Sequence, residues 1–258
     1  MKIATFNVNG ITARLPRVLE WLAETSPDVA CLQELKTSDE TFPAAALREA
    51  GYSAVWHGQK GFNGVAVLAR GDDLVEVRRG LPGDPDDTHS RYLEATTHGI
   101  VIASIYLPNG NPIGSDRFAY KLAWMQRFAA HARALLAFEE VLVLLGDYNV
   151  IPEPIDAKEP EAWINDALFQ PETRAAFRTL LNLGLTDAVR ACLPGAGIYT
   201  FWDYQAGAWQ KDKGIRIDHI LASPQATDRL AAAGVDTFTR AWEKPSDHVP
   251  VWVEIAEE

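Results

Sequence analysis

The sequence predicts an α/β protein whose sheets combine parallel and antiparallel strands. Two observations support this class. Residues 2–33 read as a strand, a helix and a second strand, which is the pattern of a parallel βαβ unit. Residues 52–106 then hold several apolar, strand-like segments separated only by turns, and such short connections favour antiparallel pairing.

The first strand, residues 2–7, and the second, residues 28–33, both end in polar residues. Asn7 and Asn9 follow the first strand, and Gln33 and Glu34 close the second. Ligand sites in α/β sheets gather at such strand ends, although Glu34 alone would equally fit a helix cap or a surface carboxylate. The helix between the strands has an apolar face and two prolines, one early in the helix and one closing it: Val18, Leu19 and Leu22, with Pro16 and Pro27.

Strand-like segments bounded by turn residues follow at 52–57, 64–69, 74–78, 92–96 and 100–106. The last of them ends at Tyr106 and leads into a polar turn that contains Asn109. This is a third place where a strand leaves an apolar run for polar residues. We therefore treat Tyr106 and Asn109 as further candidates for a site at the strand ends.

A long helix is expected over residues 116–137, where apolar residues recur at helical spacing and mark the core face: Phe118, Leu122, Met125, Ala129, Ala132 and Leu136. Three basic residues of this helix, Arg117, Lys121 and Arg127, are expected on its solvated face, and a phosphate track is the alternative because the strand exit at Tyr106 is close. A second helix is expected over residues 174–183, because Gly184 follows as a stop signal.

The apolar run 141–145 predicts a strand that is buried on both faces. Asp147 and Asn149 follow it with one residue between them, and side-chain alternation along an extended backbone points both the same way. A carboxylate beside an amide suits metal binding, proton abstraction or contact with a phosphate oxygen. A simple turn is the alternative, since glycine, aspartate and asparagine all favour turns.

Three more segments complete the pattern near the end of the chain. Residues 199–204 are rich in aromatic side chains and fit a half-buried strand. Residues 216–222 predict a strand whose apolar alternation is broken by Asp218, and a carboxylate within a strand requires a specific partner. Asp247 and His248 directly precede the final strand, so they form another polar cluster at the end of a sheet.

Bulk properties limit the possible classes of protein. The 258 residues are enough for one large domain, and we expect a single domain over residues 1–258. No apolar run approaches membrane-spanning length, and no signal peptide is recognisable. The two cysteines are far apart, which indicates a reduced, cytoplasmic protein. A net charge of −11 argues against a protein that coats nucleic acid non-specifically, but not against a nuclease with a locally basic cleft.

The polar residues at the strand ends are mostly oxygen donors, without the paired cysteine and histidine spacing of a zinc site. Such donors favour Mg²⁺ or Mn²⁺, and together with a candidate base and a histidine they suit cleavage of a phosphate ester. The sequence has no phosphate-binding glycine loop and no G-x-S-x-G elbow, so kinase, NTPase and serine hydrolase activities lack support.

Seven motifs in chain order carry a resemblance to a known family: FNVNG, LQELK, YLPNG, GDYNV, YTFWDY, RIDHILAS and SDHVPV. Together they resemble the exonuclease III family of abasic-site endonucleases, within the metal-dependent endonuclease/exonuclease/phosphatase superfamily. The resemblance covers essentially the whole chain. It implies a four-layer α/β sandwich, in which two mixed β-sheets pack face to face and helices flank them.

The resemblance also implies roles for individual residues. Glu34 matches the principal ligand of an Mg²⁺ or Mn²⁺ ion, and the metal group also includes Asn7, Asp247, Asp147 and Asn149. Asp147 matches the residue that activates the attacking water, Asn149 orients that water or the phosphate, and His248 contacts the phosphate while Asp218 holds it. The implied substrate contacts are Tyr106 and Asn109 at the phosphate and Phe201, Trp202 and Ile215 around a flipped-out abasic sugar. Asn9 is neutral where some relatives are acidic, which places a second metal ligand there in doubt.

The implied reaction is hydrolysis of the phosphodiester 5′ to an abasic site in duplex DNA, which leaves a 3′-hydroxyl. The resemblance adds 3′–5′ exonuclease and 3′-phosphatase activities and does not rank them. We expect a monomer whose partner is double-stranded DNA with abasic sites or 3′ blocks, and no membrane. The alternatives are a metal-dependent phosphatase or phosphodiesterase for inositol phosphates or phospholipids, which would lack the YTFWDY pocket, and a binding module that has lost catalysis.

Overall fold

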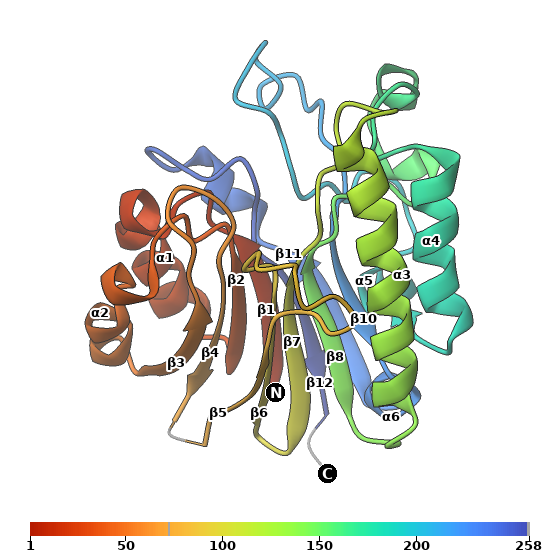
Figure 1. Cartoon of the computed structure of the whole chain (residues 1–258). Coiled ribbons are helices and arrows are strands. Elements are labelled where there is room, and N and C mark those ends of the chain that lie inside the picture. Colours follow the sequence, from red (N-terminus) through yellow and green to blue (C-terminus); the bar gives the residue numbers. More distant parts are fainter. Residues whose placement is uncertain (72, 257–258) are drawn as a thin grey trace.

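The computed structural model describes residues 1–71 and 73–256. It contains two six-stranded sheets, with strand orders β11-β12-β1-β2-β4-β3 and β5-β6-β7-β8-β10-β9. The sheets lie between two groups of helices (Figure 1). This arrangement confirms the predicted four-layer α/β sandwich of two mixed sheets.

The first sheet, sheet A, consists of β1 (Lys2–Asn7), β2 (Val29–Gln33), β3 (Tyr52–His57), β4 (Val65–Arg70), β11 (Leu230–Val235) and β12 (Val251–Ile255). The second, sheet B, consists of β5 (Val75–Arg79), β6 (Tyr92–Thr97), β7 (Ile100–Tyr106), β8 (Leu142–Asp147), β9 (Thr186–Asp187) and β10 (Asp218–Ala222). The α-helices are α1 (Ile11–Thr25), α2 (Ala44–Glu49), α3 (Asp116–Leu136), α4 (Pro171–Asn182), α5 (Ala188–Cys192) and α6 (Pro224–Thr227).

Each sheet has one parallel pair of strands joined by a helix, and its other pairs are antiparallel. In sheet A, β1 and β2 run parallel and are connected by α1, whereas in sheet B, β7 and β8 run parallel and are connected by α3. Strand β1 lies between β2 and β12, so the first strand of the chain pairs with the last. Both predictions about connections, a βαβ unit at the start and antiparallel strands afterwards, are confirmed.

Three apolar layers hold the sandwich together. The central layer joins the two sheets through side chains such as Ile3 and Cys31 from sheet A and Val143 and Leu145 from sheet B. Helices α1 and α2 cover the outer face of sheet A, and α3 and α4 cover sheet B (Figure 1). Strand β8 contributes to the central layer and to the layer under α3, which confirms a strand buried on both faces.

Helix α3 differs from the predicted helix in the phase of its apolar face. Its buried side chains are Lys121, Trp124, Met125, Phe128 and Ala132. Phe118 and Leu122 are only partly buried, and Leu122 lines a groove between α3 and α4. The prediction that Lys121 lies on the solvated face was therefore wrong, because the face of the helix that carries Lys121 and Trp124 is the one that packs on sheet B.

Helix α1 begins earlier than expected. It starts at Ile11, so Pro16 lies inside the helix and not near its beginning. A proline there leaves the carbonyl of Thr12 without its helical N–H donor. Both Thr12 and Pro16 are exposed, so water can satisfy that carbonyl and the helix continues.

The aromatic segment 199–204 is not a strand. Only Phe201 pairs there, through isolated bridges to Ile215 and His248. The expected strand at 216–222 begins at Asp218, so this carboxylate occupies the first position of β10 and not its middle. Among the described residues, no helix has the length and apolar character to cross a bilayer.

At Gly146, the backbone of β8 leaves no room for a side chain beside β7. It pairs with Ile105, and a Cβ atom at position 146 would lie 1.9 Å from the Ile105 carbonyl oxygen. Any side chain at this position must therefore push the two parallel strands apart, directly before Asp147.

We expect Gly146→Ala to lower the free energy of unfolding by about 3 kcal/mol, since overpacking against main chain cannot relax by a rotamer change. Urea denaturation followed by circular dichroism measures the loss. Gly195→Ala is the control, because a Cβ at Gly195 meets no atom within 4 Å; it should change stability by less than about 0.5 kcal/mol. Equal stability of the two variants would contradict this account of Gly146.

Candidate active site

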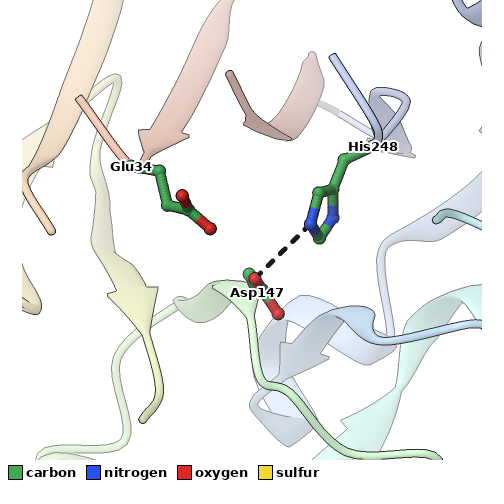
Figure 2. Close-up of side chains that lie close together, drawn as sticks. All are labelled: Glu34, Asp147 and His248. Atoms are coloured by element: carbon green, nitrogen blue, oxygen red, sulfur yellow. Dashed lines mark ion pairs between the residues drawn. The ribbon is translucent and has the colours of Figure 1, made fainter. Parts of the chain in front are cut away.

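Four strand ends from the two sheets meet at one end of the sandwich. Asn7 ends β1, Glu34 follows β2, Tyr106 ends β7 and Asp147 ends β8. Because β1 and β2 are parallel, as are β7 and β8, each pair presents its carboxyl ends together. Glu34 and Asp147 approach one another from these ends, and His248 faces them (Figure 2).

Asn7 links the carboxylates of the two sheets. Its side-chain Nδ2 donates to Glu34 Oε1 and to Asp147 Oδ2, both at 2.9 Å. Its Oδ1 accepts from the backbone N–H of Asn9 at 3.0 Å, which fixes the orientation of the amide. The Tyr106 hydroxyl donates to Glu34 Oε1 at 3.0 Å, so Glu34 is also held from sheet B.

Glu34 remains ionised although it is largely buried. Burial alone would raise its pKa, but the hydrogen bond from Asn7 and the nearby Lys36 ammonium outweigh burial and lower the pKa below its usual value. Lys36 Nζ lies 2.8 Å from Glu34 Oε2. Glu34 leaves β2 with a positive φ of 53°, a left-handed backbone that turns its side chain away from the strand direction.

Asp147 has a different electrostatic environment. Burial, together with the neighbouring Asp218 and Glu34 carboxylates, raises the pKa of Asp147 to about 7, against the opposing effect of His248. Asp218 is close because it pairs with Asp147 across β8 and β10. A carboxyl group with a pKa near neutrality is suited to take a proton from water.

His248 lies between two carboxylates. Its Nδ1 is 2.9 Å from Asp218 Oδ2, and its Nε2 is 3.8 Å from Asp147 Oδ2. Burial would lower the pKa of His248, but the two carboxylates outweigh it and raise the pKa to about 10. The ring is therefore a cation at neutral pH, with both nitrogens protonated, so it can donate to an anion but cannot ligate a metal. The partner that Asp218 was predicted to require is His248.

Asn149 and Asn109 form an amide pair beside Asp147. Asn109 Nδ2 donates to Asn149 Oδ1 at 3.1 Å, and Asn149 Nδ2 donates to the Leu107 carbonyl at 2.9 Å. The backbone N–H of Asn149 donates to Asp147 Oδ1 at 2.9 Å. Asn149 has a φ of 49°, so the extended backbone assumed from the sequence ends before it. A hydrogen-bonded turn, and not strand alternation, places Asp147 and Asn149 together.

Glu34, Asp147 and His248 offer ligand atoms that all lie within 4.8 Å of one another, a spacing that could hold a metal ion. Since His248 is cationic, the two carboxylates are the donors that fit a hard divalent cation. Asp247 lies to one side, where its Oδ1 accepts from Asn9 Nδ2 at 3.0 Å. Asn9 thus contacts Asp247 through an amide donor.

The three expected pocket residues differ in their surroundings. Phe201 is partly buried, and its ring meets the His248 ring edge to face with centroids 4.9 Å apart. Ile215 pairs with Phe201 and is 1 % exposed within the apolar cluster against which Phe201 also packs. Trp202 is 2 % exposed and packs against Tyr199 and Trp209. The Phe201 ring therefore contacts His248, whereas Trp202 reaches this end of the site through its backbone N–H, which donates to the Asp247 carbonyl at 2.9 Å.

Sequence reasoning missed the contacts of Lys36 and Lys121. Lys36 stands two residues after Glu34 within the LQELK motif, so its nearness to the carboxylate was available as a signal. For Lys121 the solvated face was favoured, since a lysine in an exposed-looking helix position is usually solvated, and its closeness to Tyr106 was the one contrary signal. Its contacts with the main chain beside Asn109 and Asn149 are visible only in the folded chain.

Comparison with known proteins gives the same result along the whole chain. Residues 4–248 match the model of the Endonuclease/Exonuclease/phosphatase family. The chain belongs to this family. It is 35% identical to exodeoxyribonuclease III of Haemophilus influenzae, an alignment that covers 98% of this chain and 99% of that relative.

Two solved structures share the fold over their full lengths. The 3′ phosphatase NExo from Neisseria, bound to a product DNA hairpin, has a TM-score of 0.95 and 41% identity, with 100% of both chains covered. An AP endonuclease from Archaeoglobus fulgidus has a TM-score of 0.95 and 39% identity, again with 100% of both chains covered. The resemblance noted from the seven motifs is confirmed, and the chain is an enzyme of this nuclease family.

Binding of a divalent cation should release protons at pH 7. The pKa of about 7 leaves about half of the Asp147 carboxyl groups protonated, and a cation favours the ionised form. Calorimetric titration with Mg²⁺, in two buffers of different ionisation enthalpy, should give about half a proton per ion. Affinity should weaken as the pH falls below 7, since protons then compete with the ion.

The control for this measurement is Asp147→Asn, which has no ionisable group at the position. Its apparent binding enthalpy should not depend on the buffer, because the linked proton is gone. Wild-type protein whose enthalpy is equally independent of the buffer would show that Asp147 carries no exchangeable proton at pH 7.

Proposed function

We propose that the protein is a metal-dependent DNA repair nuclease that hydrolyses the phosphodiester 5′ to an abasic site in duplex DNA. It also removes 3′-terminal nucleotides and 3′-phosphates. One observation carries the proposal. Asp147 is buried, has a pKa of about 7 and lies with its Oδ2 atom 3.8 Å from Nε2 of the cationic His248 ring. A carboxylate oxygen of Asp147 also lies within 4.8 Å of one of Glu34, so both could bind the same metal ion. A base, a fixed cation and a metal group thus surround one space, as phosphodiester hydrolysis requires.

The metal is Mg²⁺ or Mn²⁺, because the available donors are oxygens. Glu34 and Asp147 would hold it, with Asn7, Asn149 and Asp247 as the neighbouring donors. A bound divalent cation supplies positive charge to the phosphate oxygens and lowers the pKa of coordinated water. The donor set supports this group, since Glu34 and Asp147 are two largely buried carboxylates whose nearest cationic partners are Lys36 and His248.

The side chains divide the remaining work. Asp147 accepts a proton from water, whose oxygen then attacks phosphorus in line with the 3′-oxygen that leaves. The bond between phosphorus and that oxygen breaks, which yields a 3′-hydroxyl and leaves the phosphate on the abasic sugar. His248, kept protonated by Asp218, donates from Nε2 to a phosphate oxygen. Asn109 and Tyr106 lie where they can contact the same phosphate.

Phe201 supplies the selection for abasic sites. Its ring lies against His248, and its backbone pairs with Ile215 in an isolated β-bridge, so an apolar ring adjoins the proposed phosphate position. A sugar without a base is flipped out of the helix at little expense and is small enough to rest on such a surface, whereas an intact nucleotide is not.

A single assay tests the proposal against its alternatives. Purified protein is incubated with a duplex that holds one abasic site, with Mg²⁺ or after chelation, and in parallel with a soluble inositol phosphate. Cleavage 5′ to the site that requires the metal, without release of phosphate from the inositol compound, is expected. The reverse pattern would identify a phosphatase, and no reaction on either would identify a binding protein. Sedimentation of the active species should give a monomer.

Asp147→Asn should reduce kcat on the abasic duplex by about 100-fold to 10,000-fold, because the shape is kept while the base is lost. Fluorescence anisotropy should show DNA affinity within about threefold of wild type, since affinity comes mostly from other phosphate contacts. A decrease in kcat of less than about tenfold would remove Asp147 from the role of base.

Phe201→Ala should reduce the preference for an abasic duplex over an undamaged one, while removal of a 3′-phosphate should suffer less. The flipped sugar needs the apolar surface, and a terminal phosphate does not. The measurement is relative kcat/KM on the three oligonucleotides at one salt concentration.

Phe169→Ala is the matched control for Phe201, since Phe169 packs against the same apolar cluster but contacts Arg174 and not His248. It should leave the ratio between the three substrates unchanged. Equal losses on all three substrates for Phe201→Ala would show that Phe201 only packs the core.

A further inference from the structure

Lys121 places its side-chain amine in the interior of the protein, and burial lowers the pKa of this group to about 7. Lys121 is 0 % exposed, although lysine side chains almost always keep their ammonium group in water. It is one of the buried residues of α3, with Trp124, Met125 and Phe128, which pack in the layer between this helix and sheet B. A buried polar group of this kind is tolerated only where particular groups of the protein bind it.

The ammonium group contacts the main chain of the two loops that leave the parallel pair of sheet B. Lys121 Nζ donates to the Asn109 carbonyl at 3.0 Å and to the Asn149 carbonyl at 2.6 Å. The side chains of these same two residues are joined by the 3.1 Å hydrogen bond from Asn109 Nδ2 to Asn149 Oδ1. Lys121 therefore holds the main chain of both residues whose side-chain amides are proposed to contact the phosphate.

The loop after β7 is shaped around the stem of this lysine. A Cβ atom at position 110 would lie 2.6 Å from Lys121 Cδ and 3.3 Å from Ala167 Cβ. Gly110 also has a φ of 90°, a conformation that side chains rarely adopt. The close approach of Gly110 to the lysine stem allows the Asn109 carbonyl to reach the ammonium group. The contact therefore depends on a glycine at position 110.

We infer that Lys121 is a positioning residue for phosphodiester hydrolysis, which holds Asn109 and Asn149 in register through their two carbonyls. The inference rests on the proposed function. The ammonium acts through two carbonyls and does not touch substrate. Burial lowers the pKa of Lys121 to about 7, and Asp147 and Asp166 favour its charged form from a distance against this larger effect.

Lys121→Met tests the inference, because methionine fills similar space without charge or donor. We expect kcat on the abasic duplex to decrease by about 10-fold to 100-fold, with KM changed by less than about threefold, since misplaced amides lose transition-state contacts more than ground-state affinity. The matched control is His131→Ala. His131 lies near the other end of the same helix, away from the two loops, and the change removes its 2.9 Å contact with Glu94. It should lower the melting temperature without changing kcat.

A double-mutant cycle separates positioning from general stability. If Lys121 acts through Asn109, Lys121→Met should lower kcat far less in an Asn109→Ala background than in the wild type. Additive losses would overturn the inference, as would a Lys121→Met variant that retains wild-type kcat. Should Lys121→Met fail to fold, Gly110→Ala carries the test, since it displaces the lysine stem; wild-type kcat in that variant overturns the inference. Wild-type protein that does not cleave the abasic duplex would instead refute the proposed function.

Discussion

Two like-charged carboxylates, Glu34 and Asp147, lie close together and away from water, and the site depends on how their charge is balanced. The Asn7 amide donates to both of them, Lys36 pairs with Glu34, and the His248 cation faces Asp147. These partners come from distant segments of the chain, namely the end of β1, the loop after β2 and the segment before β12, whereas Asp147 comes from the other sheet. An unbalanced buried pair of this kind would be strongly unfavourable, so the arrangement requires the complete sandwich.

The sandwich places the carboxylates through strands and not through flexible loops. Each sheet has a single parallel pair joined by a helix, and the carboxyl ends of the two pairs lie at the same end of the molecule. The packed layer between the sheets therefore determines the distance from Glu34 to Asp147. Groups carried on rigid strands hold their geometry more accurately than groups on loops, which favours catalysis by positioned charge.

Much of this architecture could be predicted from sequence because strands at 2–7, 52–57 and 100–106 show clear apolar patterns that tertiary contacts do not override. Strand ends also identified Glu34 and Asp147. Errors arose where a tertiary partner decides the outcome. The face that α3 buries depends on its docking to sheet B, so the apolar stripe alone gave the wrong phase and left Lys121 outside. Residues 199–204 have strand-like composition, but they find only bridging partners and stay irregular.

The position of β1 between β2 and β12 has a consequence for synthesis. The ribosome makes β1 first and β12 last among these strands, so a growing chain cannot complete sheet A until residues 251–255 have emerged. His248 is supplied by the segment just before β12. A chain that is interrupted before these residues lacks both the closing strand and the cation, so it carries no assembled phosphodiester-cleaving centre.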